Sequence, residues 1–102
     1  MSSESKTVQP AVLITIIGET VLQDRILQML TSLGATGYTL TPARGVGSHG
    51  RQMGDIAGYN TNIEVKTIVS QSVSDDIFSS IADYKTHHAL IAFRQNVEAL
   101  MD

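Results

Sequence analysis

The order of apolar and polar positions predicts a strand followed by a helix in the first third of the chain. The segment Ala11–Ile17 is nearly all apolar and rich in β-branched residues, which is typical of a strand covered on both faces. After a break at Gly18, apolar residues recur three or four positions apart, as on one face of a helix. These positions are Leu22, Ile26, Leu27, Leu30 and Leu33.

Polar residues and a glycine predict where this first helix begins and ends. Thr20 is followed three residues later by Gln23, which is the spacing of an N-terminal capping box. Gly34 comes directly after the last apolar position, where a helix commonly ends in a left-handed residue. The pattern therefore predicts a helix from just after Thr20 to Leu33.

The rest of the chain predicts two more strands, a second helix and a final strand. Residues 36–44 have strand character, and Pro42, which lacks an N–H, places that strand at a sheet edge. Residues 62–69 alternate, with Ile63, Val65 and Thr67 on one face. Ser74 is the expected cap of a helix whose first turn carries Asp75 and Asp76. Its apolar face is Ile77, Phe78, Ile81 and Ala82, and Ala89–Val97 is the last strand.

The resulting order β-α-β-β-α-β predicts an α+β fold of the ferredoxin-like class. Two right-handed β-α-β units build one antiparallel four-stranded sheet with both helices on one face. Residues 11–102 are expected to form this single domain. Residues 1–10 are polar and end at Pro10, so we expect a disordered N-terminal arm.

Composition removes several classes of function. The 102 residues include no cysteine, which excludes disulfides and thiolate metal sites. The net charge of -3 disfavours a nucleic-acid surface. The longest apolar run is too short for a membrane helix, and the first residues have no secretory pattern. We therefore expect a cytoplasmic protein that is not integral to a membrane.

The long connection between the two middle strands carries the most distinctive chemistry. Five of the eight glycines lie in it, and Arg44-Gly-Val-Gly-Ser-His-Gly-Arg51 combines glycines with two arginines. Glycine backbones approach ligands closely, their N–H groups line anion sites, and arginine pairs with phosphate or carboxylate through two hydrogen bonds. The segment therefore favours an anion site, with a flexible surface turn as the alternative.

Metal binding and catalysis have weaker signals. Three histidines (His49, His87 and His88) are candidate ligands, but adjacent residues of a strand point to opposite faces, and no known metal-ligand spacing is present. No serine lies in a nucleophile elbow, and no residue pair has a diagnostic acid-base spacing. We expect no metal site, no tightly bound cofactor and no enzymatic activity.

The segment Leu33-Gly-Ala-Thr-Gly-Tyr-Thr-Leu40, followed by Arg44-Gly-Val-Gly47, resembles the PII signalling proteins. The resemblance implies a homotrimer of β-α-β-β-α-β subunits that binds adenine nucleotides between subunits and reports them to a partner protein through a long T-loop. By position, Thr39 matches the threonine that contacts adenine, and the loop-base glycines match those that face the phosphates. The implied nucleotide set is Gly37, Thr39, Arg44, Gly45, Val46, Gly47, Ser48, Arg51, Val65, Lys66, His88 and Ala89.

Two departures from the classical PII pattern indicate a branch of the family. Residues 83–89 lack the glycine-rich turn that precedes the last strand, and no arginine pair follows that strand. These features resemble the PII-like proteins of inorganic-carbon metabolism, namely the SbtB proteins and the carboxysome-associated type. That resemblance implies ADP or AMP as the signalling ligand together with bicarbonate, for which Gly50, Arg51 and Gln52 are candidates. It also implies a partner such as a bicarbonate transporter or a carboxysome-related protein.

Three other functions remain open from the residues. An ACT-like regulatory domain has the same strand order and binds amino acids at subunit interfaces. A metal-responsive trimer of this fold would use the histidines. An acylphosphatase-like enzyme also has a glycine-arginine anion loop, but between the first strand and the first helix, where this chain has Gly18-Glu-Thr20.

Overall fold

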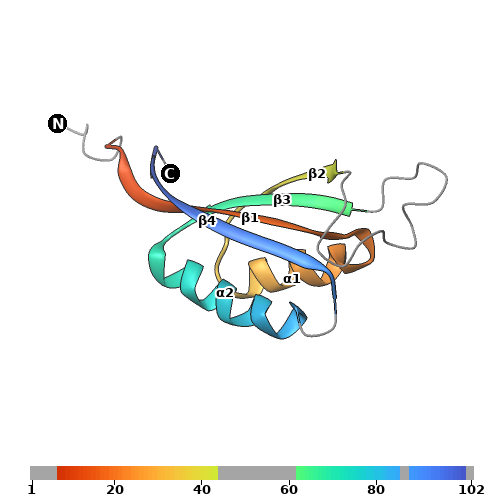
Figure 1. Cartoon of the computed structure of the whole chain (residues 1–102). Helices are drawn as coiled ribbons and strands as arrows, with labels where there is room; N and C mark the ends of the chain where they lie inside the picture. Colours follow the sequence, from red (N-terminus) through yellow and green to blue (C-terminus); the bar gives the residue numbers. More distant parts are fainter. Residues whose placement is uncertain (1–6, 44–61, 86–87, 101–102) are drawn as a thin grey trace.

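The computed structural model describes residues 7–43, 62–85 and 88–100, which form one sheet with two helices on one of its faces (Figure 1). The elements in chain order are β1 (Gln9–Glu19), the 3-10 helix η2 (Thr20–Leu22), α1 (Gln23–Ser32), β2 (Thr39–Ala43), β3 (Asn62–Val69), α2 (Gln71–Lys85) and β4 (Leu90–Ala99). The strand order is β2-β3-β1-β4, and every neighbouring pair is antiparallel. This arrangement confirms the predicted α+β, ferredoxin-like fold.

The central strand β1 supplies the middle of the hydrophobic core. Its residues Val12, Ile14 and Ile16 are at most 2% exposed. They share the sheet face that packs on the helices with their register partners in β3 and β4. The helices contribute their apolar stripes to the same core, chiefly Leu22, Ile26, Met29, Leu30, Ile77 and Ile81.

The opposite face of the sheet is not covered by either helix (Figure 1). Leu13 and Ile17 of β1 lie on this face and are half-buried. Thr15 between them is only 2% exposed, because its register partners Lys66 and Phe93 flank it on either side. The sequence predicted a strand covered on both faces, and within one chain the helices cover one. We call the uncovered side the open face.

The first helix ends as predicted but begins differently. Gly34 has φ +112°, and its N–H donates to the Thr31 carbonyl at 3.2 Å while the Ala35 N–H donates to the Leu30 carbonyl at 2.9 Å. This pair of bonds is a Schellman motif. The prediction of a capping box at Thr20 is wrong. Residues 20–22 form the 3-10 helix η2, and no side chain caps either η2 or α1.

The second helix begins one turn earlier than predicted. The hydroxyl of Ser70 accepts a hydrogen bond from the Val73 N–H at 3.3 Å, which makes Ser70 the N-cap. Ser74 is instead fully buried in the helix, so its predicted capping role is wrong, and no acidic residue lies in the first turn. Ala82, expected on the apolar face, is exposed.

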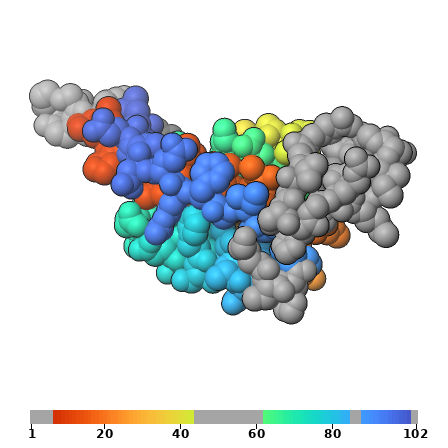
Figure 2. All heavy atoms as spheres, viewed as in Figure 1, coloured from red at the N-terminus to blue at the C-terminus, as the bar shows by residue number. Residues whose placement is uncertain are grey.

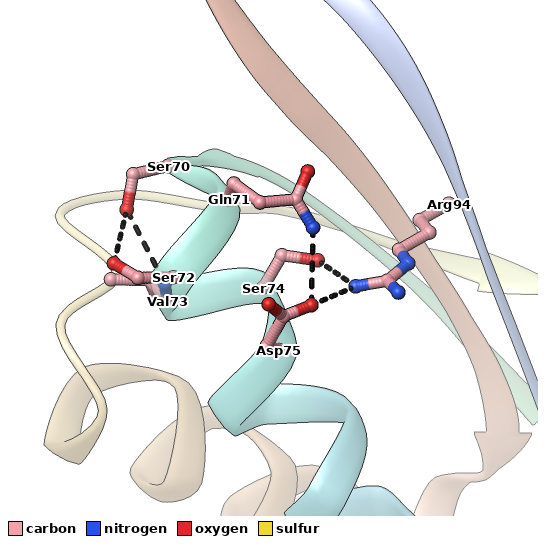
Figure 3. Close-up of polar contacts among 7 residues, drawn as sticks. All are labelled: Ser70, Gln71, Ser72, Val73, Ser74, Asp75 and Arg94. Atoms are coloured by element: carbon pink, nitrogen blue, oxygen red, sulfur yellow. Dashed lines mark hydrogen bonds and ion pairs between the residues drawn. The ribbon is translucent and has the colours of Figure 1, made fainter.

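A polar cluster joins this helix to β4 (Figure 3). The Arg94 guanidinium donates to the Ser74 hydroxyl at 2.9 Å and to the Asp75 carboxylate at 2.8 Å, and it lies 4.8 Å from the centre of the Phe78 ring. Gln71 donates to the same carboxylate at 3.1 Å. The hydrogen bond from Arg94, followed by that from Gln71, lowers the pKa of Asp75 below its usual value. The buried serine hydroxyl therefore has a charged partner.

The strands differ from prediction mainly at their ends. β1 begins at Gln9, so Gln9 and Pro10, expected in the N-terminal arm, pair with Ala99 and Glu98 of β4. The two strands extend together beyond the helices (Figure 2). β2 begins at Thr39 rather than at residue 36, and it lies at the edge of the sheet, as Pro42 predicted.

The positive φ of Gly34 predicts a specific cost for a side chain there. Gly34→Ala should lower the free energy of unfolding by about 1–2 kcal/mol, because L residues rarely adopt this backbone conformation. Gly37→Ala is the matched control: its φ is not in the positive range, and nothing lies within 4 Å of the added Cβ. Urea denaturation at one protein concentration measures both, and equal losses would contradict the assigned backbone of Gly34.

Candidate functional site

Thr39 and Lys66 form the part of the candidate site that the structure brings together. Thr39 is the first residue of β2, and its register partner across the ladder is Lys66 of β3. Directly opposite residues place their Cβ atoms about 5 Å apart on the same face of a sheet. Both residues lie on the open face and are exposed. A ligand at this edge therefore meets a hydroxyl and an ammonium group side by side.

Gly37 lies just before this pair, at the entry to β2. Its carbonyl accepts a hydrogen bond of 2.6 Å from the hydroxyl of Thr67 on β3. The glycine is exposed, and a Cβ added to it would meet no atom within 4 Å. Its backbone is thus open to a ligand.

Val65 and Lys66 differ in what they offer to a ligand. The Val65 side chain is 1% exposed and packs in the core on the helix side of the sheet. Its backbone lies between two paired strands, with Ile16 of β1 and Leu40 of β2 as register partners. Lys66, one residue later, points to the opposite face by the alternation of a strand.

His88 and Ala89 lie far from these residues within one chain. Both are half-buried and precede β4, and the His88 N–H donates to the Tyr84 carbonyl at 3.1 Å. β4 and β2 are the two outer strands, separated by β3 and β1. Because neighbouring strands are about 4.8 Å apart, the outer strands stand about 14 Å apart. One chain does not bring the two halves of the predicted set together.

The predicted phosphate and bicarbonate residues lie outside the described residues, between the ends of β2 and β3. They are Arg44, Gly45, Val46, Gly47, Ser48, Gly50, Arg51 and Gln52. The two ends of the segment are anchored side by side, because Ala43 and Asn62 are register partners. Since β2 runs from Thr39 to Ala43, it leads from the adenine-side candidates directly to this segment.

The described residues offer no alternative centre at the histidines. Within residues 7–43, 62–85 and 88–100, no group of three or more potential ligands is placed to hold a metal ion. His49 and His87 lie outside these ranges. A surface hollow of about 520 Å³ beside the start of α2 is lined by Pro10, Ala11, Val12, Gln71, Asn96, Val97 and Glu98, and none of the candidate residues lines it.

Sequence reasoning missed Thr67 and the cluster around Arg94. Thr67 is only 3% exposed and lies on the same face of β3 as the apolar Ile63 and Val65. A buried hydroxyl on an apolar face needs a hydrogen-bond partner, and this was the signal available in the sequence. What the sequence could not supply was the partner, which lies thirty residues away.

Comparisons with known proteins decide the family. The family model described as nitrogen regulatory protein P-II matches residues 11–100. The chain belongs to the P-II family. Proteins of this family form trimers and bind adenine nucleotides. The resemblance read from residues 33–47 is thereby confirmed for PII-like signalling proteins.

Solved structures of P-II relatives share the fold. A PII-like signalling protein from Thermus thermophilus is 38% identical, with 91% of this chain and 92% of that chain covered and a TM-score of 0.77. CPII from Thiomonas intermedia, a nitrogen regulatory PII-like protein bound to ADP, AMP and bicarbonate, gives a TM-score of 0.83 at 19% identity over 94% of this chain and 93% of CPII. A comparison with curated proteins finds no match. Neither helix of the described P-II chain is long and apolar enough to cross a membrane.

Proposed function

We propose that this P-II chain is a non-enzymatic sensor that binds ADP or AMP in clefts between the subunits of a homotrimer. The observation that carries the proposal is the separation of the candidate residues. Thr39 and Lys66 lie at one outer edge of the sheet, and His88 and Ala89 lie beside the other. A nucleotide that contacts both groups needs an edge from each of two chains.

In this site the adenine lies against Gly37, Thr39 and the β3 segment at Val65 and Lys66, and the phosphates extend along β2. Backbone N–H groups of residues 45–48, together with Arg44 and Arg51, bind the phosphates, since glycine backbones and arginine suit anions. The fold shared with CPII, a protein described as bound to ADP, AMP and bicarbonate, supports this choice of ligands. The chain from Gln9, where β1 begins, acts as one domain.

Bicarbonate is the proposed second ligand, bound at residues 50–52. Binding of nucleotide and bicarbonate switches the surface that the segment 44–61 offers to a partner protein. The sensor acts in the cytoplasm. Its partner belongs to inorganic-carbon metabolism, as a bicarbonate transporter or a carboxysome-related protein would. This assignment rests on the missing glycine turn at residues 83–89 and on the bicarbonate described for CPII.

The open face is the proposed surface between subunits. Ile68, Ile91 and Phe93 lie on it and are 40%, 46% and 44% exposed in the single chain. Large apolar side chains gathered on one face of a soluble domain are typical of a protein interface. A trimer closed through this face covers them and brings the outer edges of neighbouring sheets together.

Nucleotide binding is tested by calorimetry on the Thr39→Val variant. The loss of one hydroxyl at the adenine edge should weaken ADP and AMP binding about three- to tenfold, the usual range for one hydrogen bond. Thr31→Val is the matched control, because Thr31 is also an exposed threonine but lies in α1, on the helix side of the sheet. Wild-type protein that gives no heat with AMP, ADP, ATP or cyclic AMP would overturn the proposed function.

Bicarbonate coupling is tested by titrating ADP with and without bicarbonate at constant pH and ionic strength. If bicarbonate binds beside the nucleotide, it should raise ADP affinity, and ADP must raise bicarbonate affinity by the same factor. Chloride at equal concentration is the control for ionic strength. An ADP affinity that is the same in both titrations removes bicarbonate from the proposal and leaves the nucleotide site intact.

The subunit interface is tested by placing a charge on the open face. Phe93→Asp should shift the mass measured by light scattering from three chains to one, because an unpaired carboxylate is costly to bury at an interface. Val21→Asp is the matched control, since Val21 is 79% exposed but lies in η2, away from the open face. A Phe93→Asp protein that stays trimeric would exclude this face as the interface.

A further inference from the structure

The buried hydroxyl of Thr67 makes a single long-range hydrogen bond toward the candidate site. Its Oγ1 donates to the Gly37 carbonyl oxygen at 2.6 Å, a short distance for a hydroxyl bond. Thr67 is 3% exposed, and Val65 and Val69 on the same face of β3 are apolar core residues. The bond therefore joins the helix-facing side of β3 to the segment that leads into β2.

Little else in the described chain holds Gly37. The β2–β3 ladder begins with the Thr39–Lys66 pair, so Gly37 precedes it. The backbone hydrogen bonds made by described residues outside the helices and strands do not include Gly37. It has no side chain to pack, and a Cβ added to it would meet no atom within 4 Å. The Thr67 hydroxyl is thus the contact that fixes this glycine, which otherwise has the widest conformational freedom of any residue.

Fixing one carbonyl sets the direction of the neighbouring groups. The peptide between Gly37 and Tyr38 is trans and planar, so the Tyr38 N–H points away from the Thr67 hydroxyl. The same plane sets the backbone that leads into Thr39. Groups held in their bound geometry before the ligand arrives lose less conformational freedom on binding, which raises affinity.

We infer that Thr67 is a positioning residue for the adenine end of the nucleotide site, an inference that rests on the function proposed above. It does not contact the ligand. Its hydroxyl holds the Gly37–Tyr38 peptide and, through it, Thr39 in the orientation that meets the base. A purely structural role, in which Gly37 only satisfies a buried hydroxyl, predicts a different outcome when that hydroxyl is removed.

The test compares Thr67→Val with Thr67→Ser in calorimetry with adenosine, AMP and ADP. Valine keeps the shape of threonine but loses the hydroxyl, so the affinities for all three ligands should fall by a similar factor of about three to ten. The factor is similar because the loss lies at the base, which the three ligands share. Serine keeps the hydroxyl and should bind within about twofold of wild type. Thr67→Cys, whose thiol is a weak donor, replaces the valine variant if that variant does not fold.

Ser74→Ala is the matched control for loss of a buried hydroxyl. The Ser74 hydroxyl accepts from Arg94 at 2.9 Å, in the cluster between α2 and β4. Its removal should lower the melting temperature and leave nucleotide affinity unchanged. The melting temperature of each Thr67 variant is measured beside its affinity, so that a structural effect is separated from a positioning effect.

The outcomes separate the two levels of the proposal. Wild-type protein that binds none of the three ligands overturns the nucleotide function and this inference with it. Wild-type protein that binds, while Thr67→Val or Thr67→Cys binds equally well, overturns the inference alone. A loss that grows from adenosine to ADP also overturns it, because the effect would then lie at the phosphates.

Discussion

The position of β1 between β3 and β4 is the constraint on which the rest of the structure depends. One ladder joins β1 to the first strand of the second β-α-β unit, and the other joins it to the last strand of the chain. Both units therefore share one sheet, and both crossover helices pack on the same apolar face of β1. Because β1 and β3 take the two inside positions, β2 and β4 are the outer strands, and candidate ligand residues lie at both edges.

The periodicity of the sequence accounts for most of this fold, and particular residues show where it stops. Gly34 predicted a left-handed residue at the end of α1, and Pro42 predicted an edge strand. Both requirements are local in the sequence, and both predictions are confirmed. The predicted start of α2 was wrong, because Ser70, Ser72 and Ser74 are all residues of a type that caps helices. Which of them begins the helix depends on where β3 ends and on Arg94 in β4, which takes Ser74 as a buried partner.

The candidate site was predictable to the extent that its residues are close in the sequence. Gly37 and Thr39 came from one short motif, and the structure places Lys66 directly opposite Thr39. Thr67 was missed, because its role depends on a partner in another β-α-β unit. The distance between Thr39 and the start of β4 also could not be predicted, since it follows from the strand order and not from spacing along the chain.

The pairing of Ala43 with Asn62 has a consequence for how the fold tolerates the connection between β2 and β3. The sheet itself brings the two ends of the 44–61 connection together, so the core does not depend on the connection to join them. Each doubling in the length of such a connection costs only about 0.6 kcal/mol in closure entropy. The stability of the hydrophobic core therefore places little constraint on the length of this connection.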